Sequence, residues 1–249
     1  MAGHSRFKKI KHKKAIEDKK RSKEFSKVSH EISVAVKAGG GDPNDNPRLR
    51  MAISTARRFN FPKAKVDDAI RKGLNPNDGE SIEEVRYEGF GPSGVALLVE
   101  AISHSKQLAN DKSAIRKVFS RHNGSLGEGG CVSFIFQRLG LITYPGDDRS
   151  EDDMMMLAIE HGADDCQKVE DEFEILCSFE KLHEVKEKLE KQIGEPSSAK
   201  PIWKPNSYVT LDNSKTKSVL RLIDELEDVD AVQEVWSNLE IPDSFNYEE

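Results

Sequence analysis

The chain has 249 residues, of which 36% are hydrophobic and 33% are charged, and its formal net charge at pH 7 is -6. No apolar run approaches the roughly 18 residues of a membrane-spanning helix, and the N-terminus lacks the apolar segment of a secretory signal. The three cysteines are too few and too widely spaced for a disulfide framework. We therefore expect a cytoplasmic protein of one to three domains.

The charge is concentrated at one end of the chain. Residues 1–72 contain 20 Lys or Arg against 8 Asp or Glu, whereas the remaining residues contain 18 basic and 36 acidic side chains. The first block therefore carries a net charge of +12 within an acidic protein. Such segregation favours an anionic partner for the N-terminal block.

The first block predicts three helices. Apolar residues recur at helical spacing over 25–36, and the glycines at 39–41 end this helix. Asn46 can cap a second helix, whose first position suits Pro47. Pro62 begins a third helix, with Gly73 as its end. The first block thus predicts a small helical domain that begins with a basic arm, which we expect to be mobile until bound.

The rest of the chain alternates strand and helix patterns. The run "GVALLVEAI" at 94–102 predicts a buried strand, residues 106–124 an amphipathic helix, and "CVSFIFQRLG" at 131–140 a second strand. Residues 207–241 predict another strand–helix–strand unit. Between these two units, residues 140–205 follow the order β-α-β-β-α-β, which is typical of a ferredoxin-like domain.

We therefore predict an α+β fold with an N-terminal three-helix domain and two ferredoxin-like α/β domains, one inserted into the other. The predicted domains are residues 1–80, residues 81–140 together with 206–249, and the insertion 141–205.

Two glycine-rich segments do not fit nucleotide-binding motifs. "GFGPSG" at 89–94 matches G-x-G-x-x-G, but it precedes a strand and opens no helix, so a tight turn is the better interpretation. "HNGSLGEGGC" at 122–131 lacks the G-K-[ST] ending of a P-loop. It is interpreted as a loop between helix and strand, with a backbone contact surface as the alternative.

Catalytic and metal-binding patterns are missing from the sequence. The seven histidines are scattered, no C-x-x-C occurs, and no G-x-S-x-G context is visible. Acidic pairs fall at expected helix starts and turns, where they compensate the helix dipole. We therefore expect a protein that is not an enzyme and needs no metal and no cofactor.

The basic block is the remaining functional candidate. Its arm is too rich in lysine for every charge to pair with an acid, and Arg50 and Arg57 lie seven residues apart on the second helix, away from its apolar face. A solvated surface and a membrane surface are the alternatives, but the arm has few apolar anchors. The candidate nucleic-acid-binding residues are Arg6, Lys8, Lys9, Lys11, His12, Lys13, Lys14, Lys19, Lys20, Arg21, Arg48, Arg50, Arg57 and Arg58.

Several segments resemble one known family. These are "MAGHS", "IKHKKA", "GGGDPNDNPRLRMAI", "FPKAKVDDAIRKG", "YEGFGPSGVALLVEA", "NGSLGEGGCVSFIF" and "DVDAVQEVWSNLE". Together they resemble the YebC/PmpR group of transcriptional regulators and translation factors over essentially the whole chain. The resemblance implies three domains, no catalysis, DNA binding by some members, and ribosome-associated action by others, including relief of stalling at consecutive prolines.

One departure lies in the arm, where this chain has Arg6-Phe7 and family members often have Lys-Trp. Phenylalanine can stack, but it lacks the indole N–H donor. We expect a nucleic-acid-binding regulator of gene expression that contacts DNA through the basic block. The alternative is a translation factor that binds the ribosome through ribosomal RNA, since no helix-turn-helix, zinc finger or aromatic RNA platform is evident in the sequence.

Overall fold

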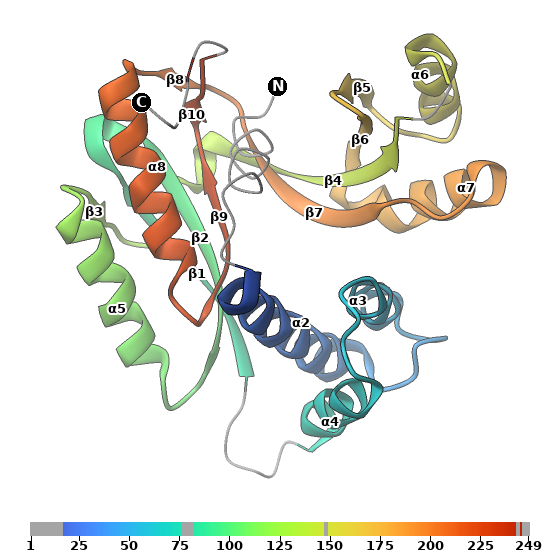
Figure 1. The fold of residues 1–249 in the computed structure, drawn as a ribbon, viewed down its shortest axis with the longest axis horizontal. Helices are drawn as coiled ribbons and strands as arrows, with labels where there is room; N and C mark the ends of the chain where they lie inside the picture. Colours follow the sequence, from blue (N-terminus) through green and yellow to red (C-terminus); the bar gives the residue numbers. More distant parts are fainter. Residues whose placement is uncertain (1–16, 76–81, 147–148, 243–244, 246–249) are drawn as a thin grey trace. The chain divides into compact units, whose positions relative to one another are not determined.

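The computed structural model describes residues 17–75, 82–146, 149–242 and 245, and for residues 17–23 it describes the backbone alone. The fold has two compact units (Figure 1): one spans Phe136–Lys204, and the other combines the described residues up to Ile135 with those from Pro205 onward.

Three helices form the N-terminal domain: α2 (Glu17–Gly39), α3 (Pro47–Arg58) and α4 (Lys63–Leu74). Asn46 begins α3 as predicted, because its side-chain oxygen accepts a hydrogen bond from the Leu49 N–H at 3.1 Å. The Asn46 amide also donates to the carbonyl oxygens of Ala35 and Gly40, each at 2.8 Å, and thereby ties the end of α2 to the start of α3.

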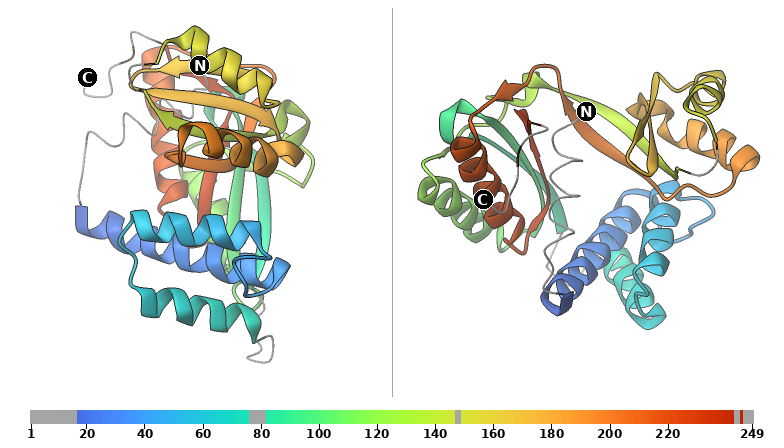
Figure 2. Two further views of the ribbon diagram at one scale, coloured as in Figure 1. Left: turned by 90° about the vertical axis from the view of Figure 1, so that its right-hand side faces the viewer. Right: turned by 45° about the horizontal axis from the view of Figure 1, so that its top comes forward.

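Both α3 and α4 pack against α2 (Figure 2) around a core that includes Ile32, Leu49 and Phe61. Helix α4 ends at Leu74, one residue after Gly73, which the sequence predicted as its end. A Cβ atom at this position would lie 2.7 Å from both the Ser33 carbonyl oxygen and the Val36 Cβ. The glycine therefore also allows α4 to approach α2 closely.

The second part of this unit is a four-stranded sheet of order β3-β1-β2-β9, with one apolar core shared by the sheet and two helices. Its strands are β1 (Ile82–Phe90), β2 (Ala96–His104), β3 (Ser125–Leu126) and β9 (Val232–Ser237), and its helices are α5 (Leu108–Arg121) and α8 (Asn213–Glu227). A short turn, η2 (Pro92–Gly94), joins β1 to β2, so "GFGPSG" is a turn as predicted. Two further strands, β8 (Val209–Thr210) and β10 (Leu239–Glu240), pair in parallel.

Two details of this sheet differ from the sequence prediction. The strand β1 was not predicted at all, although it lies between β2 and β3. Residues 131–140 do not form a strand of this sheet, because the chain leaves it through the short turn η3 (Ser133–Ile135). The buried Glu88 carboxylate accepts hydrogen bonds from the N–H groups of Val132 and Ser133, at 2.9 and 2.8 Å, which holds this segment as a loop.

The other unit follows the predicted order β-α-β-β-α-β, with sheet order β5-β6-β4-β7. Its elements are β4 (Phe136–Pro145), α6 (Glu151–Glu160), β5 (Asp165–Val169), β6 (Glu172–Ser178), η4 (Phe179–Lys181), α7 (Leu182–Ile193) and β7 (Ser198–Pro205). Ile142, Phe173 and Leu189 are fully buried between the sheet and its helices. The predicted α+β fold class is therefore confirmed.

Two properties of the described residues bear on membrane and thiol chemistry. No helix among them combines the length and apolar character needed to cross a membrane. Cys166 and Cys177 are buried as free thiols, and burial raises the pKa of each to about 11. These two cysteines therefore serve as packing residues rather than reactive thiolates.

Candidate nucleic-acid interface

The predicted binding residues of the arm fall into two groups. Seven of them lie outside the described residues: Arg6, Lys8, Lys9, Lys11, His12, Lys13 and Lys14. Lys19, Lys20 and Arg21 lie in the first turns of α2, which begins at Glu17. This part of the predicted arm is therefore helical.

Helix α3 presents three arginines to solvent. Arg50, Arg57 and Arg58 are exposed, whereas Leu49 and Ala56, about a quarter turn away from Arg50 and Arg57 around the helix, are buried. No hydrogen bond or ion pair joins these three side chains to another described residue. Seven residues advance an α-helix by nearly two full turns and about 10 Å, so Arg50 and Arg57 lie almost in line along the helix. The packed apolar side of the helix holds the backbone that carries them.

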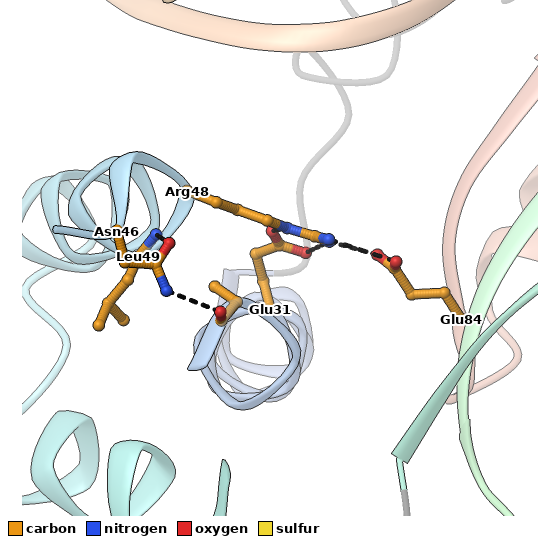
Figure 3. A network of polar contacts seen from close by, with 6 residues as sticks. Glu31, Asn46, Arg48, Leu49 and Glu84 are labelled. Carbon is orange, nitrogen blue, oxygen red and sulfur yellow. Dashed lines mark hydrogen bonds and ion pairs between the residues drawn. The ribbon is translucent and has the colours of Figure 1, made fainter. Parts of the chain in front are cut away.

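Arg48 differs from these three arginines because its guanidinium forms ion pairs with two carboxylates of the same chain (Figure 3). Its Nε and Nη2 donate to the two carboxylate oxygens of Glu31 at 2.7 and 3.0 Å, and Nη1 donates to Glu84 Oε2 at 3.2 Å. Nη2 also contacts Glu84 Oε1. Burial works to lower the pKa of Arg48, but the hydrogen bonds to both carboxylates outweigh burial and raise it. We therefore assign Arg48 to an intramolecular ion-pair network that joins α2, α3 and β1.

Two lysines of α2 also have internal partners. Lys27 Nζ donates to the Gln233 carbonyl oxygen at 2.6 Å, and Lys37 Nζ donates to the Ile82 carbonyl oxygen at 2.8 Å. These contacts, like the Arg48 network, connect the helical domain to the first sheet. The positive charge of the described helical domain is thus divided between cations with polar partners in the chain and exposed cations on α3 and α4.

The turn from α3 to α4 adds residues that the sequence prediction missed. Phe59 is 43% exposed, and Lys63 and Lys65 in the first turn of α4 are exposed as well. The signal was present in "RRFNFPKAK" at 57–65, which contains four cations, two aromatic residues and no acid. Of this segment, only Arg57 and Arg58 were among the predicted binding residues, and Pro62 was interpreted as the start of a helix.

The glycine-rich loop at 122–131 is built around Glu88, whose side chain is only 2% exposed. Burial works to raise the pKa of Glu88, but hydrogen bonds from the backbone N–H groups of Val132, Gly130 and Ser133 lower it overall. An anionic ligand would need these same N–H groups. Because Glu88 already occupies them, we assign the loop a structural role.

The described parts of the chain also bear on metal binding. No group of three or more His, Cys, Asp or Glu side chains there has an arrangement that could hold a metal ion.

Comparison with known families covers nearly the whole chain. A model described as the TACO1/YebC protein N-terminal domain matches residues 5–75, and a model described as the TACO1/YebC second and third domain matches residues 82–239. This chain belongs to the TACO1/YebC family. The resemblance identified from the sequence segments is thereby confirmed.

The fold of this TACO1/YebC family member is similar to a solved structure. A conserved hypothetical protein from Aquifex aeolicus, known from its crystal structure, is 42% identical in sequence, with a TM-score of 0.84. The match covers 91% of this chain and 93% of that chain.

Within the TACO1/YebC N-terminal domain, α3 and the first turn of α4 carry exposed cations. We call these cations, Arg50, Arg57, Arg58 and Lys63, the α3 surface. Its cations are carried by α3, whose apolar side is packed, and by the first turn of α4. Such an arrangement can bind an anionic chain chiefly through its charge.

Proposed function

We propose that this protein is a non-enzymatic, cytoplasmic regulator of gene expression that binds nucleic acid through the α3 surface and the basic block around it. The observation that carries this proposal is the exposure of Arg50, Arg57 and Arg58, which have no partner among the described residues. Phosphate backbones are suitable counterparts, because each phosphate neutralised by Lys or Arg releases condensed counterions. The net charge of +12 in residues 1–72 supports the same partner.

A lipid surface fits these residues less well. Binding in the plane of a membrane requires a broad apolar helix side opposite a polar one. The apolar side of α3 is already buried in the helical core, with Leu49 and Ala56 each 0% exposed. The outer side of α3 offers arginines, which favours phosphate contacts in water.

Phosphate contacts position a protein on nucleic acid but carry no sequence information. The α3 surface therefore favours binding that depends weakly on sequence. DNA binding in transcriptional regulation is our first candidate. A translation factor bound to ribosomal RNA is the second candidate, and it is favoured by the exposed Phe59 ring, which could contact an unpaired base.

The test is crosslinking in cells, followed by sequencing of both the bound DNA and the bound RNA. The matched control replaces Arg50, Arg57 and Arg58 together by Gln, which keeps the polar side chains and removes their charge. Discrete DNA peaks that the control loses would support the transcriptional regulator, and enrichment of ribosomal RNA would support the translation factor. Crosslinking no stronger than the control for either nucleic acid would refute the proposal.

A further inference from the structure

The α3–α4 turn holds two phenylalanines in opposite environments. Phe61 is 8% exposed, and its ring meets the Phe25 ring edge-to-face with 5.0 Å between ring centroids. Phe59, two residues earlier, is 43% exposed. One aromatic ring therefore completes the helical core, and the other faces solvent.

The backbone of the turn determines this difference. The Phe61 N–H donates to the Ala56 carbonyl oxygen at 2.9 Å, and the Asn60 N–H donates to the Arg57 carbonyl oxygen at 3.0 Å. Asn60 has a φ of 52°, in the left-handed region. These features define a Schellman motif, in which the residue after the left-handed position returns to the core. The motif buries Phe61 and holds the backbone of Phe59 in a fixed turn at the surface.

The sequence around Phe59 is cationic. Arg57 and Arg58 precede it, Lys63 and Lys65 follow it, and all four are exposed. Residues 57–65 contain no acidic side chain. Lys65 Nζ lies 5.8 Å from the centroid of the Phe25 ring and so remains close to this turn. An exposed aromatic ring close in sequence to exposed cations matches the combination that proteins use to bind single strands, where bases stack on aromatic rings and cations follow the backbone.

We propose that Phe59 stacks on an unpaired base while the neighbouring cations hold the flanking phosphates, so that the protein prefers unpaired strands to duplexes. This inference rests on the proposed nucleic-acid binding and names the class of strand that is bound. An unpaired strand favours the second candidate, a factor bound to ribosomal RNA, over a regulator bound to duplex DNA. In a duplex the faces of the bases are covered by their stacked neighbours, and only base edges are open in the grooves. A phenylalanine ring has no hydrogen-bonding group with which to read those edges.

The experiment compares full-length wild type with Phe59→Leu, which keeps an apolar side chain but removes the ring, and with Phe59→Tyr, which keeps the ring. The probes are a single strand containing 2-aminopurine and a duplex with the same number of phosphates, each made as DNA and as RNA. We expect wild type to quench the 2-aminopurine and to prefer the single strand. Phe59→Leu should weaken single-strand binding by about tenfold, leave duplex binding within about twofold and keep the salt dependence, whereas Phe59→Tyr should behave as wild type.

Unchanged single-strand affinity in Phe59→Leu, or an equal loss for single strand and duplex, would overturn the stacking role. Failure of the proposed function itself has a different signature, because wild type would then bind no probe at low salt, and this result would overturn both proposals. The DNA and RNA arms show which unpaired strand is bound more tightly. Stacking on either one supports the inference.

Discussion

Replacing Arg48 should affect stability and leave nucleic-acid binding intact. Its side chain is 39% exposed, and those of Glu31 and Glu84 are 38% and 53% exposed, so solvent screens both ion pairs. An exposed ion pair contributes about 0.5 kcal/mol to stability. The pair with Glu31 is bidentate, and bidentate pairs are the stronger ones. We therefore expect Arg48→Gln to lower the free energy of unfolding by about 1 kcal/mol. In a chain of this length that change corresponds to a Tm lower by about 2–4 °C.

The assay combines thermal unfolding with nucleic-acid affinity measured over a range of salt concentrations. The matched control is Arg57→Gln on the same helix, whose side chain has no partner among the described residues. Arg57→Gln should keep the Tm within about 1 °C and reduce the log–log salt slope by about 0.7 to 0.9 if one phosphate contact is lost. An Arg48→Gln variant with an unchanged Tm and a reduced salt slope would place Arg48 on the nucleic acid and refute its internal assignment.

Three further predictions concern stability. Gly73→Ala should destabilise the protein by about 1–2 kcal/mol in denaturant unfolding, because overpacking against α2 outweighs the better helix propensity of alanine; a stabilised variant would refute the close approach. Asn46→Ala should lower the free energy of unfolding by about 1–2 kcal/mol, since it removes the α3 cap, and a loss below about 0.3 kcal/mol would contradict this. The pKa of Glu88 is lower in the folded protein than its ordinary value of 4.5. The ionised carboxylate therefore stabilises the fold above pH 4.5, and this stabilisation is lost as the pH falls through the pKa of the folded protein. Unfolding measured between pH 7 and pH 3 should therefore show a smaller acid-induced loss for Glu88→Gln than for wild type, and equal losses would argue against the Glu88 assignment.

Local sequence signals predicted much of the fold. The pair Asn46-Pro47 located the start of α3, and the alternation of strand and helix patterns gave the order of the unit from Phe136 to Lys204. The strand β1 escaped prediction because its first part, "IEEVR", is charged and largely exposed, so it lacks the apolar run that reveals a buried strand. Such a strand is recognised only once its neighbour β2 is known.

Other features depended on contacts between residues far apart in the chain. Gly73 is typical of a helix end by residue type, and only the proximity of Val36 shows that it is needed for helix packing. Arg48 could not be distinguished from Arg50 by sequence, because Glu31 and Glu84 lie 17 and 36 residues away along the chain. Residues 131–135 have the composition of a strand, but the buried Glu88 carboxylate fixes them as a loop. The composition of a basic block thus predicts its overall charge, while the fold decides which cations remain available.

The most direct test of nucleic-acid binding through the first block is the salt dependence of affinity for DNA and RNA. If the block neutralises roughly six phosphates, the log–log slope for wild type should be about -4 to -5. Neutralising Lys8, Lys9, Lys11, Lys13 and Lys14 should remove most of this slope without changing the Tm, and adding Arg50→Gln and Arg57→Gln should weaken binding further. A slope that survives all of these changes, or the absence of binding by wild type at low salt, would contradict the account.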